Sequence, residues 1–121
     1  MERHIIAAAS FAQKKYFFEP SFSDLPESVQ EEIHVLCVTL AEKLECTFTI
    51  SFLEDGDVQF EVIQTENIID FDDIGAELEI KEIRREKSEL LKALKIWYLI
   101  YKTPDGEKVK EELLKTGKVE L

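Results

Sequence analysis

Glycine is scarce in this sequence, and its scarcity excludes whole classes of function. The four glycines, Gly56, Gly75, Gly106 and Gly117, stand far apart. A glycine-rich loop needs consecutive backbone N–H groups to hold a phosphate, so nucleotide binding through a P-loop or a Rossmann motif is excluded. No serine stands in a Gly-x-Ser-x-Gly arrangement. The sharp turn that exposes a serine nucleophile in hydrolases is therefore unsupported.

Cysteines and long apolar runs are scarce as well. If Cys37 and Cys46 lie on one helix, they stand about 13 Å apart, beyond the ~7 Å limit for a disulfide. We predict two free thiols, which are typical of a reducing compartment, and we expect a cytoplasmic protein. The apolar stretch at residues 5–9 is too short for a membrane span and marginal for a signal peptide.

Basic residues are outnumbered, and they are missing from one long stretch. The chain carries 26 acidic and 15 basic residues, with a net charge of −11. This charge repels phosphate backbones and anionic lipid, so we predict no nucleic-acid partner and no membrane partner. Residues 54–79 contain ten acids and no base, whereas residues 80–102 contain seven bases and three acids. A change of sign within one predicted helix favours pairing with another protein.

The composition is that of an ordinary globular protein, and the length of 121 residues predicts a single domain over residues 1–121. We expect the α+β class. An antiparallel β-hairpin (about 46–53 and 57–64) would pack on helices at about 25–45 and 72–102, with a short N-terminal and a short C-terminal helix. Asp24 is expected to cap the first long helix, because Pro26 and Glu27 follow it at positions typical of a helix start.

The hairpin is the clearest pattern in the chain. Apolar residues alternate with polar ones on both sides of Asp55 and Gly56. A two-residue turn would put the two apolar faces on opposite sides of the ribbon. A three-residue loop ending at Gly56 pairs Phe52 with Val58 and keeps the apolar faces together, so we predict that register.

The predicted helix at 72–102 is long for a domain of this size. Thirty-one helical residues span about 46 Å, whereas a compact domain of this length is about 35 Å across. Part of the helix must protrude, kink or pair with another chain, and residues 81–89 are the candidate segment. Over the whole predicted helix, apolar residues recur at near-helical spacing. They are Ile74, Leu78, Ile83, Leu90, Leu94, Trp97 and Tyr101.

Several residue pairs suggest chemistry, but none supports a site. His34 and Cys37 would share a helical face as a nucleophile pair or half a metal site. Cys37 has apolar neighbours and no helix N-terminus nearby, so a buried structural cysteine is favoured. The segment that begins at Asp70 resembles a calcium loop, but its twelfth position is Lys81 instead of a carboxylate. We therefore assign no catalytic, metal-binding or cofactor-binding residue, and we expect no cofactor.

Two clusters in the long helix remain as candidates for contact. An aromatic cluster around Trp97 is expected to pack in the core, because it continues the helical stripe. A basic cluster could contact an acidic partner, although the interleaved glutamates also suit a solvated, ion-paired face. The candidate protein-interaction residues of this cluster are Lys81, Arg84, Arg85 and Lys87.

Two stretches resemble a family of small uncharacterised bacterial proteins from Gram-positive anaerobes. The first runs from Lys14 through the Lys-Lys-Tyr-Phe-Phe-Glu-Pro segment to Val38, and the second from Ile74 to Tyr98. The resemblance covers most of residues 14–101. It implies a cytoplasmic bacterial protein with a domain of unknown function, and it supplies no site residue.

The sequence therefore leads to a protein of unknown function, which we interpret as a non-enzymatic interaction or regulatory module. Its partner would be another protein or a second copy of itself in a homodimer. The reasons are that the helix predicted at 72–102 is too long for a compact domain and that the sign of the charge changes along it. The alternative is a small-molecule-binding protein or an enzyme, with a pocket between the hairpin and the helix that carries Trp97.

Overall fold

The structure is a computed structural model, and it describes residues 3–63, 73–103 and 111. The class is α+β, as predicted. In chain order the elements are β1 (Arg3–Ser10), β2 (Lys15–Phe18), a 3₁₀ turn η1 (Pro20–Phe22), α1 (Glu27–Leu44), β3 (Thr47–Leu53), β4 (Val58–Ile63), α2 (Asp73–Glu86) and α3 (Ser88–Tyr101).

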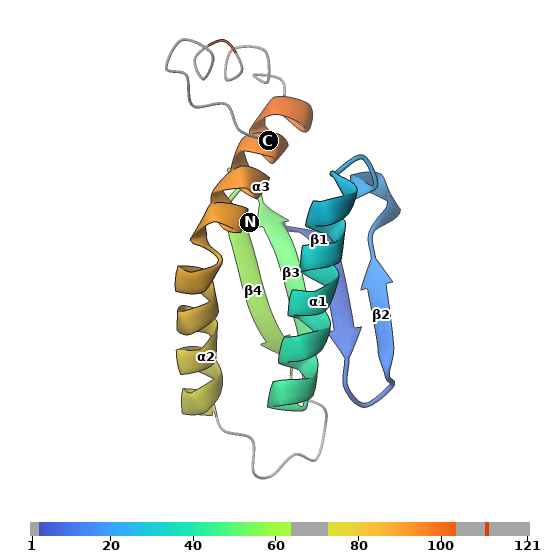
Figure 1. The fold of residues 1–121 in the computed structure, drawn as a ribbon, viewed down its shortest axis with the longest axis vertical. Coiled ribbons are helices and arrows are strands. Elements are labelled where there is room, and N and C mark those ends of the chain that lie inside the picture. The colour runs from blue at the N-terminus through green and yellow to red at the C-terminus, as the bar shows by residue number, and fades with distance from the viewer. Residues whose placement is uncertain (1–2, 64–72, 104–110, 112–121) are drawn as a thin grey trace.

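The four strands form one antiparallel sheet in the order β2-β1-β3-β4. Figure 1 shows α1 and α3 on the same face of this sheet, with α2 continuing from α3 beside β4. Helix α1 lies over β1 and β3, the two central strands, and makes fewer contacts with β2. No described helix covers the opposite face of the sheet. The domain therefore has two layers, and its core lies between them.

The predicted hairpin register is confirmed. Phe52 pairs with Val58, Ile50 with Phe60 and Phe48 with Val62. Gly56 closes the turn with a φ of 88°, a left-handed value that other residues rarely adopt. Its N–H donates to the Leu53 carbonyl at 2.9 Å, which completes the three-residue loop.

The predicted N-terminal helix is wrong, because residues 3–18 form the strands β1 and β2. Alanine favours helices in isolation, but β1 gains two neighbouring strands here, and such tertiary pairing overrides propensity. Ala7 and Ala9 pair with Ile50 and Phe48 on the buried face of the sheet. A register shift between Ile5 and Ala7 places Ile6 in the core beside Ala7, and this bulge hides the strand alternation in the sequence.

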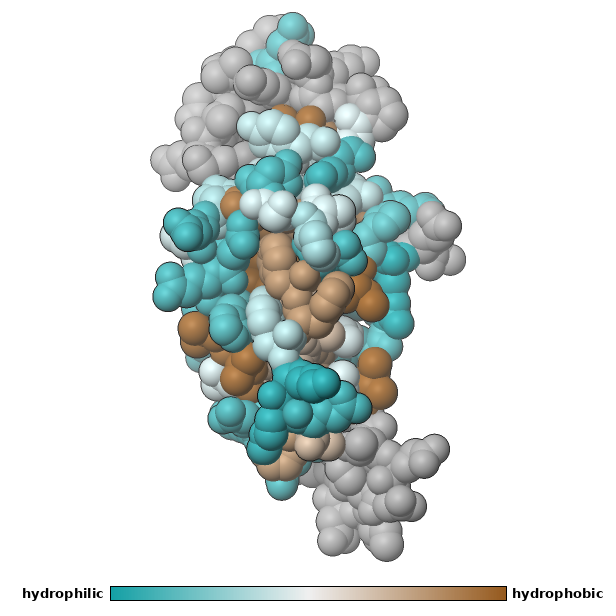
Figure 2. All heavy atoms as spheres, turned by 90° about the vertical axis from the view of Figure 1, so that its right-hand side faces the viewer, coloured by the Kyte–Doolittle hydropathy of each residue, from teal (hydrophilic) through white to brown (hydrophobic). Residues whose placement is uncertain are grey.

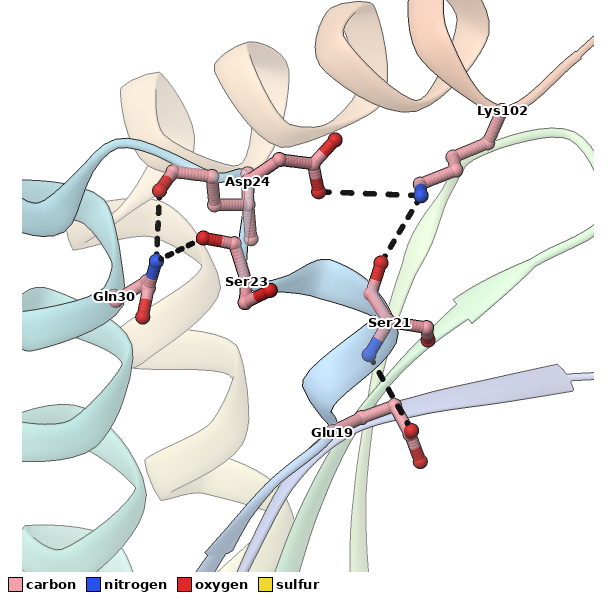
Figure 3. Close-up of polar contacts among 7 residues, drawn as sticks. Glu19, Ser21, Ser23, Asp24, Gln30 and Lys102 are labelled. Atoms are coloured by element: carbon pink, nitrogen blue, oxygen red, sulfur yellow. Dashed lines mark hydrogen bonds and ion pairs between the residues drawn. The ribbon is translucent and has the colours of Figure 1, made fainter.

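Helix α1 confirms the helix predicted at about 25–45, but Asp24 is not its cap. The helix begins at Glu27 after Pro26, with no side chain bonded to its first N–H groups. The side-chain amide of Gln30 instead donates to the carbonyls of Ser23 at 2.9 Å and Leu25 at 2.7 Å. Figure 3 shows that Asp24 turns the other way, toward Lys102 at the end of α3.

The long helix predicted at about 72–102 is two helices, α2 and α3, which meet at Lys87. Lys87 leaves helical geometry with φ of −102° and ψ of 22°, although hydrogen bonds still link Lys87 to Ile83 and Leu91 to Lys87. The bend lets α3 cross the hairpin while α2 lies beside β4 (Figure 1). The overlong rod therefore kinks. The predicted C-terminal helix lies outside the described residues, apart from Glu111.

Aromatic side chains join α3 to the sheet. Phe52 stacks on Trp97 with 6.3 Å between ring centroids, and it contacts Tyr98 at 4.7 Å and Phe22 at 5.4 Å. At the hairpin turn, Lys95 on α3 binds the Asp57 carboxylate at 2.7 Å. This hydrogen bond lowers the pKa of Asp57 and raises that of Lys95. The aromatic cluster thus packs in the core as expected, except that Tyr101 is exposed.

Replacing Gly56 by alanine should destabilise the protein by about 1–2 kcal/mol, because the left-handed backbone disfavours a side chain. The new Cβ would also lie 3.2 Å from a Tyr98 ring carbon and 3.3 Å from a Lys95 side-chain carbon. Urea unfolding measures the change. Glu54→Ala in the same turn, where the residue is exposed and its φ is negative, should stay within about 0.5 kcal/mol of the parent. Equal losses for the two variants would contradict this account of the turn.

Candidate functional site

The predicted basic cluster does not form one surface. Arg84 turns toward the sheet, donates to the carbonyl of Val58 at 2.9 Å and lies over the ring of Phe60. Lys87 lies 3.1 Å from a carboxylate oxygen of Glu32 on α1. These two bases bind the end of α2 to the sheet and to α1.

The other two bases point away from the fold, together with two apolar residues. Ile74 is 73% exposed and Leu78 is 61% exposed, and Lys81 and Arg85 are exposed too. At about 100° per residue, these four positions fall within an arc of about 60° on one side of α2. We call them the α2 outer stripe. Within residues 3–63 and 73–103, the ion pair of Arg85 is with Glu82 of its own helix.

In the sequence, Ile74 and Leu78 belong to the same near-helical apolar spacing as Ile83. Their angular position shows the difference, since Ile83 lies about 180° around the helix from Ile74. Ala76 is buried and Ile80 and Ile83 pack against the core. An angular count over residues 73–86 would have identified two separate apolar faces.

Polar contacts hold α2 to α1. Lys43 on α1 binds Glu79 at 2.7 Å, in addition to the contact between Lys87 and Glu32. Between the two helices lies a groove of about 330 Å³, and apolar side chains, among them Leu36 and Ile83, line part of it. Helix α2 therefore stands off α1, and its outer stripe faces away from the core.

The hairpin face beneath α3 is packed. Phe48, Ile50, Phe52, Val58 and Phe60 are all buried, and the rings of Trp97 and Tyr98 cover Phe52. The described residues give no support to the alternative pocket between the hairpin and the Trp97 helix.

His34 and Cys37 both lie on α1, but their side chains lie in different surroundings. His34 is exposed and stacks on Tyr16 of β2, with 4.1 Å between ring centroids. Cys37 is fully buried, and its thiol donates to the carbonyl of Phe48 at 3.3 Å. Across residues 3–63 and 73–103, no group of three or more His, Cys, Asp and Glu side chains is placed to hold a metal ion. The calcium-like segment from Asp70 lies largely outside the described residues.

Burial makes both thiols poor nucleophiles. It raises the pKa of Cys37 to about 12, with a smaller contribution from Cys46, and it raises the pKa of Cys46 to about 11. Both are free, as predicted. A reactive cysteine needs a lowered pKa and access to solvent, and these two have neither.

The comparisons with known proteins give a family without an activity. The sequence model of the Family of unknown function (DUF6145) matches residues 3–113. Comparison with curated proteins finds no match, and comparison with solved structures finds none either. None of the described helices is long and apolar enough to cross a membrane. The bacterial source implied by the resemblance stays a prediction.

A thiol reagent should distinguish buried structural cysteines from reactive ones. At pH 8 we expect the folded protein to resist Ellman's reagent, because both pKa values lie well above that pH. After unfolding in guanidinium, two thiols per chain should react. The control is Thr39→Cys at an exposed position on α1, which should react at once in the folded protein. Rapid reaction of the folded parent would contradict this assignment.

Proposed function

The chain belongs to the Family of unknown function DUF6145, and from this premise we propose that it is a non-enzymatic protein–protein interaction module of the cytoplasm. The contact element is α2. The observation that carries the proposal is the α2 outer stripe, which presents Ile74 and Leu78 to solvent directly beside Lys81 and Arg85. The two buried free thiols support a reducing compartment.

Exposed apolar residues scattered singly are normal on a protein surface, and they need no explanation. Ile74 and Leu78 are not scattered, because they lie four residues apart and share one side of a helix. The inner face of α2 is already occupied by its contacts with the sheet and with α1. The outer stripe is therefore a second apolar face on the same helix, and a helix with two apolar faces is typical of one that binds on both sides.

The order of residues along the stripe defines the chemistry of the partner. An apolar groove would accept Ile74 and Leu78, as in recognition modes where a helix lies in a groove. Carboxylates at one end of that groove would pair with Lys81 and Arg85. Arg84 and Lys87 would stay with the fold, where each already has a partner. The proposed partner is a protein with an apolar groove that is acidic at one end.

The test compares two aspartate variants at equally exposed apolar positions. Leu78→Asp changes the α2 outer stripe, whereas Val35→Asp changes α1, where Val35 is 60% exposed. A protein captured by the parent and by Val35→Asp should be lost with Leu78→Asp. With that protein purified, calorimetry should show at least about a tenfold weaker dissociation constant for Leu78→Asp, because a charge replaces a buried apolar contact.

A second variant tests the basic end of the stripe. Arg85→Glu should also weaken binding, with a smaller effect at high salt, because an exposed charge contact is screened. The proposal fails if Leu78→Asp and Val35→Asp capture the same proteins in the same amounts. Circular dichroism on both variants verifies that the helices are intact.

A further inference from the structure

The two edges of the sheet differ in what occupies them. Leu53, the last residue of β3, donates its N–H to the backbone carbonyl of Asp57, just before β4, at 2.8 Å. Since pairing alternates in antiparallel strands, Val58 and Phe60 of β4 turn their backbone groups outward. Arg84 takes up the outward carbonyl of Val58. At least one acceptor on the β4 edge is therefore covered by α2.

The β2 edge has no such cover among the described residues. The Glu19 N–H donates to Ile6 of β1 at 2.8 Å, so by the same alternation Lys15 and Phe17 bond to β1. Tyr16 and Phe18 then direct their N–H and C=O groups away from the sheet. Within residues 3–63 and 73–103 no hydrogen bond reaches these four groups. An unpaired edge of this kind is a template for another strand.

The side chains along this edge are complementary to those of an antiparallel copy of the same edge. Tyr16 and Phe18 lie on the helix-covered face, where they pair with Ala9 and Ala7 and pack against the core. Phe17 lies on the open face and is 49% exposed. By the same period of two, Lys15 shares the open face with Phe17. Glu19 follows β2 with an extended backbone (φ −70°, ψ 119°) and continues this alternation, and its carboxylate also accepts from the Ser21 N–H at 3.5 Å. The edge thus has a cation at one end, an anion at the other and aromatic rings between them.

We propose that β2 pairs antiparallel with β2 of a second copy of this chain, giving a homodimer with a continuous eight-stranded sheet. Hydrogen bonding requires Tyr16 to lie opposite Phe18 of the second copy, because these residues carry the free backbone groups. Phe17 then lies opposite Phe17 at the two-fold axis, and Lys15 lies opposite Glu19. Each cross-strand pair is aromatic with aromatic or cation with anion, and both kinds stabilise antiparallel strands.

Neighbouring registers fit less well. Placing Tyr16 opposite Tyr16 sets Lys15 against Phe17, which leaves the two charges without a partner. Placing Phe18 opposite Phe18 sets Tyr16 against Pro20, which has no N–H to donate. A lysine on an edge strand usually discourages pairing, but Glu19 four residues along makes this strand complementary to its own copy.

The molecule has room for the second strand. Helix α1 lies over β1 and β3, and between it and β2 runs a groove of about 490 Å³ lined by Tyr16, Phe18, Glu27, Glu31 and His34, among others. The second copy would place its own Tyr16 and Phe18 rings beside this groove. Figure 2 faces the β2 side and shows an apolar area in the middle of that face, bordered by hydrophilic residues. The interface adds backbone hydrogen bonds and aromatic contacts without displacing a helix.

A charge-swap cycle tests the proposed register by sedimentation equilibrium over a range of protein concentrations. The parent should dimerise. Lys15→Glu and Glu19→Lys should each weaken the dimer about tenfold, because each places like charges opposite each other twice per dimer. The double variant Lys15→Glu with Glu19→Lys should restore dimerisation. Salt near 0.15 M screens the repulsion between two chains of net charge −11 and leaves close pairs less affected.

The matched control is Lys92→Glu, which makes the same charge change at an exposed position on α3 and should leave the dimer intact. Hydrogen exchange gives an independent measure, since the Tyr16 and Phe18 amides of the parent should become protected as protein concentration rises. A parent that stays monomeric, a dimer indifferent to the single swaps, or unchanged exchange at Tyr16 and Phe18 would each overturn the proposal. Leu78→Asp should still dimerise, so the result is independent of the function proposed for α2.

Discussion

The contact of Phe52 with Trp97 and Tyr98 is the one on which the arrangement of the chain depends. Phe52 is the last residue but one of β3, the strand that pairs with both β1 and β4. Its ring meets Phe22 from the segment before α1 and the two α3 aromatics from the far end of the chain. Burying an aromatic cluster of this size contributes several kcal/mol. It fixes α3 on the hairpin, so α2 must reach its place beside β4 through the bend at Lys87.

Much of the hairpin could be predicted because two independent constraints agree there. The alternation of Phe48, Ile50 and Phe52 defines a face, and the left-handed Gly56 limits the loop length that keeps two such faces together. The hairpin of β1 and β2 is stabilised by the same strand pairing, but its sequence does not show the alternation. Ile6 at the bulge interrupts the alternation, and the small residues Ala7 and Ala9 lie on the buried face of the sheet. In the sequence, this run of alanines looks like helix propensity.

The candidate contact residues were also only partly predictable from the sequence. Lys81, Arg84, Arg85 and Lys87 are neighbours in the sequence, and their helix turns them to different sides. Arg84 and Lys87 have partners on β4 and α1, which no local pattern predicts. For Ile74 and Leu78 the sequence did hold the information. Their direction around the helix separates them from Ile83, whereas their spacing alone does not.

The reversal of charge along the chain is explained in part by contacts within the fold. The acids that precede α2 include Asp57, which binds Lys95, and the bases that follow bind elements far back in the sequence. Arg84 binds β4, Lys87 binds α1 and Lys102 donates to the Ser21 carbonyl at 3.0 Å (Figure 3). Each such contact on the surface is weak, but all of them act on the two helices that close the fold. Lys81 and Arg85 instead point outward beside the exposed apolar pair Ile74 and Leu78. This combination distinguishes the outer face of α2 from an ordinary solvent-exposed helix face, which is polar.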